Sequence, residues 1–262
     1  MTRYLPWKSG EAPEPGVPRL LCFPYAGGGA SAYGRWQREL DAHGAGVRVV
    51  PVQLPGREGR MTEPRFTDLD ELVDDMSDQL EEELEQPHVL YGHSMGALIA
   101  YALAQRRQRE GTLMPRALVL SAYRAPHLPP PRIAAPGASD EELVASLAQL
   151  GGIPAPLLKH PDFLSALMPV ARDDLRLCNG YASVLYDEPL RVPMHLFAGE
   201  EDKLVTVPEV LAWRRYAARG CEVRTLPGDH FFIRSAEEDF LGELGSLLRQ
   251  YAYEPVLAGV GV

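Results

Sequence analysis

Five residues near the middle of the chain have the types and spacing of a nucleophilic active site. Gly92-His93-Ser94-Met95-Gly96 closes an apolar stretch and leads directly into a helical pattern. A serine on such a strand-to-helix turn needs small neighbours, because the tight backbone leaves no room for side chains on the flanking residues. The pattern predicts a nucleophile elbow with Ser94 at its apex. The alternative is a serine that caps the helix between two incidental glycines.

A serine hydroxyl is a weak nucleophile without a base, so this interpretation requires a histidine and a carboxylate to orient it. Of the seven histidines, His230 follows the last strand pattern in a turn before the C-terminal helical pattern. Asp202 follows the strand pattern before that one, which gives the chain order Ser, Asp, His of α/β-hydrolases. The nearest rivals to Asp202 are Glu200, Glu201 and Asp229, and Asp187 is more distant.

The negative oxygen of a tetrahedral intermediate needs backbone N–H donors. The residue after the nucleophile, Met95, supplies one in this type of fold. A second is expected from the glycine-rich loop at residues 22–29, which follows the first long strand pattern. A phosphate-binding loop is the competing interpretation, but the segment has neither a Gly-Lys-Ser/Thr ending nor G-x-G-x-x-G.

Short apolar, β-branched segments alternate with helical patterns, as a parallel sheet with crossover helices requires. We therefore expect an α/β fold, doubly wound, with a mostly parallel central sheet flanked by helices. One domain is expected over residues 19–250, between a flexible segment at 1–18 and a tail at 251–262. The predicted strands are 19–23, 47–52, 88–92, 116–122, 194–199 and 222–226, and the predicted helices are 31–42, 67–86, 95–110, 208–219 and 235–250.

An insertion of roughly 70 residues separates the fourth and fifth predicted strands. A segment of that length is typical of a helical lid, here about 124–186. Apolar residues repeat at helical spacing in 143–150 and again in 163–168, and Gly151-Gly152 between them offers a hinge. The alternative is that both helices are simply buried against the sheet.

Composition excludes several classes of function. The net charge is −10, and residues 67–86 hold ten acidic residues and no Lys or Arg, which predicts an acidic amphipathic helix capped by Thr67 and disfavours nucleic-acid binding. No apolar stretch is long enough to span a membrane, and the first residues lack the apolar core of a signal peptide, so we expect a cytoplasmic protein. The three cysteines form no C-x-x-C pair, which argues against a disulfide framework or zinc site.

Four motifs together resemble the type II thioesterases that accompany modular polyketide and nonribosomal peptide synthases. They are F-P-Y-A-G-G (23–28), Q-L-P-G-R (53–57), G-H-S-M-G (92–96) and D-H-F-F (229–232), in a match that covers about 19–250. The resemblance implies an α/β-hydrolase that removes aberrant acyl groups from the phosphopantetheine arm of carrier domains, without metal or cofactor. It also implies that Ala26 and Met95 are the oxyanion donors and that the insertion covers an acyl pocket. Asp229 departs from the family, which often has Gly before the catalytic histidine.

Two other functions fit the same motifs. One is a small-molecule carboxylesterase or lipase, and the other is a hydrolase-fold binding module without catalysis.

A thioesterase without its own carrier domain would meet acidic carrier domains in trans, so we expect basic residues near the entrance to the active site. The candidates by motif position are Arg57, Arg60, Arg124 and Arg132.

Overall fold

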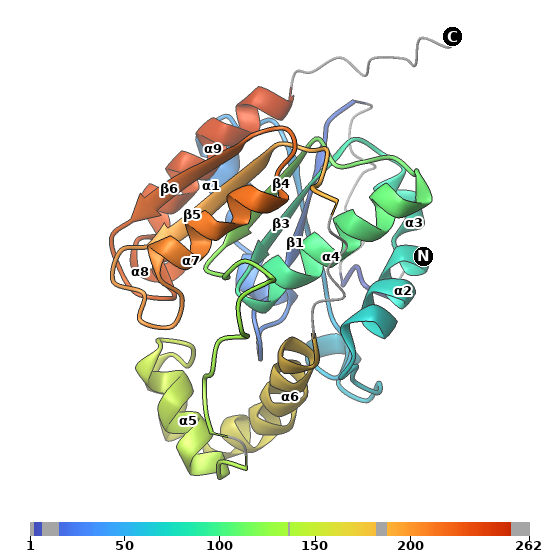
Figure 1. Ribbon diagram of the computed structural model, residues 1–262. Coiled ribbons are helices and arrows are strands. Elements are labelled where there is room, and N and C mark those ends of the chain that lie inside the picture. The colour runs from blue at the N-terminus through green and yellow to red at the C-terminus, as the bar shows by residue number, and fades with distance from the viewer. Residues whose placement is uncertain (1–2, 7–15, 136, 182–187, 253–262) are drawn as a thin grey trace, which may run out of the picture.

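A computed structural model describes residues 3–6, 16–135, 137–181 and 188–252 (Figure 1). Within these residues a sheet of six strands has the order β2-β1-β3-β4-β5-β6, and all neighbouring strands are parallel. The strands are β1 (Arg19–Phe23), β2 (Arg48–Pro51), β3 (His88–His93), β4 (Ala117–Ser121), β5 (Met194–Gly199) and β6 (Cys221–Leu226). The predicted strands and the α/β class are confirmed.

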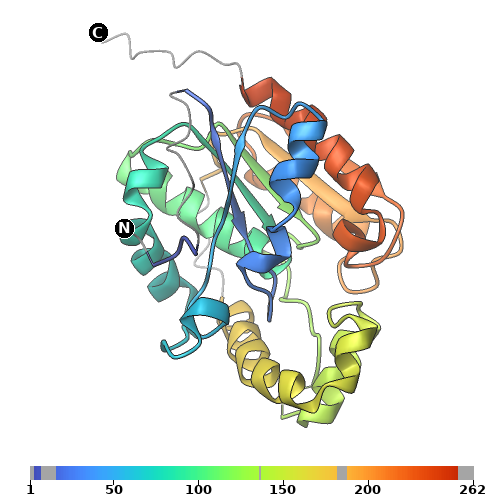
Figure 2. The same ribbon diagram turned by 180° about the vertical axis from the view of Figure 1, so that it is seen from behind.

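Helices cover both faces of the sheet, as Figures 1 and 2 show. The larger ones are α1 (Trp36–Ala42), α2 (Leu69–Gln79), α4 (Met95–Glu110), α5 (Asp140–Gln149), α6 (Pro161–Gly180) and α9 (Glu237–Ala252). Short helices are α3 (Glu81–Leu84), α7 (Val207–Leu211) and α8 (Phe232–Ser235), with 3-10 turns η1 (Ala30–Tyr33), η2 (Glu58–Arg60), η3 (Ala155–Lys159) and η4 (Ala212–Tyr216). Helices α1 and α9 lie on one face, and α2, α4 and α7 lie on the other.

The two faces bury separate apolar cores because successive strand side chains point in opposite directions. In β3, Leu90 belongs to the core under α2 and α4, whereas Val89 and Tyr91 belong to the core under α1 and α9. Strands buried on both faces must be apolar throughout, and this explains why they read as continuous apolar runs in the sequence. The sheet is therefore a rigid platform for the loops at its strand ends.

The predicted acidic helix is two helices with a different cap. Leu80 leaves helical geometry (φ −103°, ψ 9°), so α2 ends at Gln79 and α3 begins at Glu81. The prediction that Thr67 caps the helix is wrong. Asp68 has the extended backbone of an N-cap, and its carboxylate accepts hydrogen bonds from the N–H groups of Asp70 (2.9 Å) and Glu71 (3.1 Å).

The insertion between β4 and β5 holds α5 and α6 at one end of the sheet (Figure 1). It has a small apolar cluster of its own, formed by Leu143, Leu147, Ile153, Met168 and Ala171. The last turns of α6 are different, because Leu177 and Cys178 belong to the main core beside α2 and α4. The expectation of one lid over 124–186 therefore does not hold for the end of α6, and residues 182–187 lie outside the described part.

Both chain ends are more firmly packed than expected where they are described. Tyr4 is fully buried, donates a hydrogen bond to Asp75 (2.6 Å) and lies under the Arg60 guanidinium (4.5 Å from the ring centroid). The predicted flexible segment at 1–18 is thus wrong for Tyr4. Helix α9 extends through Tyr251, which is buried, so the predicted tail cannot start there. Within the described residues, no helix has the length and apolar character needed to cross a membrane.

Candidate active site

Ser94 lies on a strained turn between β3 and α4. Its backbone has φ 53° and ψ −121°, a conformation that is costly for a residue other than glycine. The flanking glycines make the turn possible: a Cβ on Gly92 would lie 2.0 Å from the Gly96 carbonyl oxygen, and one on Gly96 would lie 2.0 Å from the Phe23 carbonyl oxygen. The two glycines therefore permit close approach of three backbone segments, as a nucleophile elbow requires.

The predicted serine, histidine and aspartate meet in one hydrogen-bonded line. His230 Nε2 lies 3.0 Å from Ser94 Oγ, and His230 Nδ1 lies 2.7 Å from Asp202 Oδ2. The other oxygen of Asp202 accepts from the N–H groups of Leu204 (2.8 Å) and Val205 (2.9 Å). All three side chains are buried. An ionised Asp202 requires the proton on Nδ1, which leaves Nε2 free to accept the Ser94 proton.

The rival carboxylates that the structure describes make no hydrogen bond to His230. Glu200, Glu201 and Asp229 are exposed, and Asp187 lies outside the described residues. Asp229 accepts a hydrogen bond from the Phe231 N–H (2.9 Å), which holds it in the turn beside the histidine. Asp229 therefore carries its charge at the solvent-exposed surface.

His93, the residue before the nucleophile, is buried and contacts neighbouring side chains of the core. Its Nδ1 lies 2.7 Å from Ser121 Oγ, and its ring packs 5.5 Å from the His230 ring. Burial, together with the neighbouring His230 and Arg234, holds the pKa of His93 well below its ordinary value. A neutral His93 adds no positive charge beside His230, so it does not oppose formation of a His230 imidazolium.

The proposed oxyanion donors lie on two converging segments. Met95 is the first residue of α4, where a backbone N–H has no acceptor within its own helix. Ala26 lies in the turn after β1, which is closed by a hydrogen bond from the Gly28 N–H to the Tyr25 carbonyl (2.8 Å). The Gly96 approach to Phe23 brings the start of α4 against this turn. Both predicted donors are thus positioned on the side of the elbow where β1 ends.

A mostly apolar cavity of about 500 Å³ is lined both by this turn and by the insertion. Residues 25–29, several residues of 56–65 and Arg234 line it from the domain, and side chains of α5, α6, η3 and the loop before η3 line it from the insertion. Among these are Leu147, Ile153, Leu157, Leu167 and Val170. Met61 and Phe163 also line it and are 62% and 37% exposed, which places them where the cavity meets solvent. The cavity can take an apolar chain beside the turn that holds Ala26.

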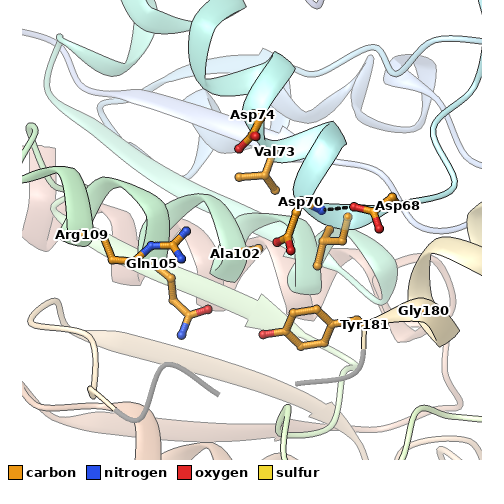
Figure 3. Close-up of a pocket in the computed structure, with 10 residues that line it drawn as sticks. Asp68, Asp70, Val73, Asp74, Ala102, Gln105, Arg109, Gly180 and Tyr181 are labelled. Atoms are coloured by element: carbon orange, nitrogen blue, oxygen red, sulfur yellow. Dashed lines mark hydrogen bonds between the residues drawn. The ribbon is translucent and has the colours of Figure 1, made fainter. Parts of the chain in front are cut away.

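A second pocket lies elsewhere and is unrelated to the serine. It lies between α2, α4 and the end of α6, has a volume of about 50 Å³ and includes Asp70, Asp74 and Gln105 (Figure 3). The Ser94, His230 and Asp202 side chains do not line it. Its size and polarity do not suit an acyl chain.

The arginines expected at a carrier-binding entrance are mostly engaged inside the protein. Arg57 is buried in a two-pronged ion pair with Asp174, at 2.7 Å for each contact. Arg60 is buried and paired with Glu63. Arg124 pairs with Glu209 (3.2 Å) and donates to a backbone carbonyl. Arg57 and Arg60 therefore do not present free charges to a partner, and of the four only Arg132 is exposed. Docking through these arginines stays a prediction.

Sequence reasoning missed two residues beside the site. Asp174 lies in the middle of α6 with no motif around it, yet its carboxylate contacts the turn that holds Ala26. Arg234 donates to the carbonyl of Gly151 (2.6 Å), which ties the predicted hinge to α8, just after His230. In the described residues, no group of three or more His, Cys, Asp or Glu side chains could hold a metal ion.

Comparisons with known proteins agree with this geometry. Residues 18–248 match the family model of the thioesterase domain. The chain is 34% identical to the gramicidin S biosynthesis protein GrsT of Aneurinibacillus migulanus, over 88% of this chain and 89% of that protein. It is 39% identical to the RedJ thioesterase of the prodiginine pathway in Streptomyces coelicolor, with a TM-score of 0.82 over 89% of this chain and 91% of RedJ.

A further solved relative is the type II thioesterase BorB from the borrelidin biosynthetic cluster. It is 33% identical, with a TM-score of 0.76 over 91% of this chain and 94% of BorB. The predicted α/β-hydrolase fold and the resemblance to type II thioesterases are confirmed. The chain belongs to the thioesterase family.

Proposed function

We propose that this thioesterase removes aberrant or stalled acyl groups from the phosphopantetheine arm of carrier domains in a polyketide or nonribosomal peptide pathway. The observation that carries the proposal is the buried Ser94–His230–Asp202 line, together with an apolar cavity of about 500 Å³ that the Ala26 turn lines. The pathway names of GrsT, RedJ and BorB support the assignment of the substrate class. The carrier domain would be a separate protein that docks in trans.

In the first step Ser94 Oγ attacks the thioester carbonyl carbon while His230 Nε2 accepts the hydroxyl proton, 3.0 Å away. A C–O bond forms, and the electron pair of the carbonyl moves onto its oxygen, where Ala26 and Met95 N–H groups stabilise the charge. Asp202 stabilises the imidazolium through Nδ1. Collapse of the intermediate breaks the C–S bond, and His230 returns the proton to the thiolate.

In the second step water hydrolyses the acyl-serine. His230 takes a proton from the water as its oxygen attacks the ester carbon, and the same two N–H groups hold the oxyanion. The C–O bond to Ser94 then breaks, and His230 returns the proton to Ser94 Oγ. The products are a free carboxylic acid and the restored enzyme, and no metal or cofactor is required by this chemistry.

The insertion would act as the lid over the acyl chain. Its wall of the cavity is apolar, and its own cluster is separate from the two cores of the sheet. The domain would span about residues 19–250. The proposal also includes a cytoplasmic location for the enzyme and its carrier partner.

A parallel assay tests the substrate class. The same acyl group is offered as a thioester on a carrier domain, as a thioester of N-acetylcysteamine, and as a p-nitrophenyl ester. We expect the highest kcat/KM for the carrier-bound thioester, and Ser94→Ala serves as the inactive control. Equal or faster turnover of the oxyester, with no preference for the carrier, would indicate a carboxylesterase. Binding of the acyl-carrier without turnover of any substrate would indicate a non-catalytic module.

A further inference from the structure

A buried ion pair connects the insertion to the turn that carries Ala26. The Arg57 side chain is 8% exposed and the Asp174 side chain 3% exposed. Arg57 Nη1 and Nη2 each donate to a different oxygen of the Asp174 carboxylate, both at 2.7 Å. Arg57 follows β2, whereas Asp174 lies in α6, so the pair joins two segments that are far apart in the chain.

The pair also holds the backbone of the turn. Asp174 Oδ2 accepts a hydrogen bond from the Gly27 N–H at 2.7 Å, and Arg57 Nη1 donates to the Gly28 carbonyl at 3.1 Å. The Gly27 N–H belongs to the peptide plane that begins at the Ala26 carbonyl. Fixing this plane restricts rotation of the Ala26 backbone, and therefore the direction of the Ala26 N–H.

Helix α6 limits the same turn by shape as well. Gly27 has φ +76°, and a Cβ at this position would lie 2.9 Å from a methyl carbon of Leu167. The Asp174 carboxylate and the Leu167 side chain, both from α6, therefore contact the turn at Gly27. A buried carboxylate is stable only when its charge is paired and its oxygens accept hydrogen bonds, and Arg57 and Gly27 supply both.

We propose that Asp174 is a positioning residue for the oxyanion hole, and that Arg57 fixes the Asp174 carboxylate for this task. The inference rests on the proposed role of Ala26 as an oxyanion donor. It assigns part of the catalytic power to the insertion, because the group that orients the turn comes from α6. A helix that is part of the substrate cover then also sets the geometry of the reacting centre.

The chain offers a matched control one residue away. Asp173 accepts from Arg65 Nε at 2.8 Å, so it joins α6 to the same segment after β2. This carboxylate makes no hydrogen bond to residues 25–29 in the described part of the chain. Asp173→Asn therefore removes a comparable ion pair without touching the oxyanion turn.

The test compares Asp174→Asn with Asp173→Asn on p-nitrophenyl hexanoate, with active sites titrated by a fluorophosphonate. In Asp174→Asn, the amide N–H₂ faces a donor, either Arg57 Nη2 or the Gly27 N–H, and the negative charge that pairs with Arg57 is lost, so the turn is held less firmly. We expect kcat to fall about 10- to 100-fold, less than for outright removal of an oxyanion donor, with KM changed less than threefold. Asp173→Asn should keep kcat within twofold.

A second readout separates positioning from a structural role. An aliphatic trifluoromethyl ketone forms a tetrahedral adduct with the serine, so its affinity should fall in parallel with kcat/KM in Asp174→Asn. The matching methylene analogue has a CH₂ group in place of the ketone carbonyl and forms no oxyanion. It should bind equally well to Asp174→Asn and Asp173→Asn. Should Asp174→Asn fail to fold, Arg57→Lys keeps the positive charge but loses the two-pronged contact, and we expect a smaller loss of kcat with the same pattern.

Three results would overturn the proposal. They are a kcat of Asp174→Asn within twofold of the parent, an equal loss of kcat in Asp173→Asn, and affinities for the ketone and its methylene analogue that fall together in Asp174→Asn. Because the test uses an oxyester, its result can be interpreted even if the enzyme does not act on carrier-bound thioesters. Lack of carrier specificity would reject only the proposed substrate, whereas unchanged oxyester kcat would reject only the role of Asp174.

Discussion

The serine turn (residues 92–96) and the insertion are held in place by different kinds of contact. At the turn, Gly92 and Gly96 let three backbone segments approach closely, so the position of Ser94 follows from the main chain of two adjacent strands and one helix. The insertion instead builds its own small apolar cluster and contacts the domain through particular side chains, such as the Arg57–Asp174 pair and Arg234.

The difference shows that backbone contacts suit a fixed catalytic group, whereas side-chain contacts suit a segment that moves. Backbone contact in a close-packed core leaves little freedom, which suits a nucleophile that must stay within hydrogen-bond distance of its base. Side-chain contacts at the edge of the insertion, such as that of Arg234 with the Gly151 carbonyl, can break and re-form, which suits the proposed cover over the acyl chain. The predictions below test each half of this comparison.

The largest effect is expected from Ser94→Ala. The change removes the atom that forms the acyl-enzyme, while the strained turn keeps its flanking glycines. We expect loss of turnover by at least about 10⁴-fold, with unchanged circular dichroism and thermal unfolding. Mass spectrometry after a short incubation with substrate checks for an acyl adduct, which should be absent. Retention of more than a few per cent of parental hydrolysis would reject Ser94 as the nucleophile.

Asp202→Asn should have the next largest effect. An asparagine can donate where the aspartate accepts, so it favours the tautomer of His230 with the proton on Nε2, which cannot take the serine proton. We expect kcat to fall by about 10⁴-fold with little change in KM. The control is Asp229→Asn, because this exposed carboxylate contacts only the turn beside His230. A larger loss in the control would identify Asp229 as the orienting carboxylate.

Acid should destabilise the sheet through its buried histidines. Burial lowers the pKa of His88 to about 4, below its ordinary value of about 6.5. Between these values the unfolded chain binds a proton that the folded chain does not, so stability is complete above pH 6.5 and falls as the pH drops toward 4. The contribution of His88 amounts to about 3 kcal/mol.

Urea unfolding at pH 7 and pH 4.5 measures this loss. His88→Asn keeps a donor for the Gln86 carbonyl, which accepts from His88 Nδ1 at 2.8 Å, but cannot take up a proton. The variant should lose less stability on acidification than the parent, although His93 maintains part of the pH dependence. Identical losses in parent and variant would mean that His88 titrates normally in the folded protein.

The smallest effect is a difference in local opening. We expect backbone amides in α5 and the first half of α6 to exchange with solvent faster than those in β3, and to slow when a long-chain acyl analogue binds. Hydrogen-exchange mass spectrometry of residues 127–170 against 88–93 measures both. The Arg234 bond to Gly151 should make the region around the glycine pair slower than α5 itself. Exchange as slow as that of β3, with or without ligand, would show a static cover and a preformed pocket.

Much of the fold and the site could be predicted from local patterns. The strands alternate with helices in the order that a parallel sheet needs, and the elbow is recognisable because a strand, two glycines and a helix occur together around one serine. His230 and Asp202 follow from the same logic, since loops after neighbouring parallel strands meet at one edge of the sheet. These features depend on backbone geometry and chain order, which a single sequence contains.

Only the tertiary structure decided how charged side chains are used. In the sequence Arg57 resembles an exposed arginine, and Asp174 is an ordinary position in an amphipathic helix, but folding buries both against the Ala26 turn. The end of α6 likewise joins the main core although the rest of the insertion keeps to its own cluster. The physical reason is that burial and pairing depend on segments more than 100 residues apart, here 117 for the Arg57–Asp174 contact, which no local spacing encodes.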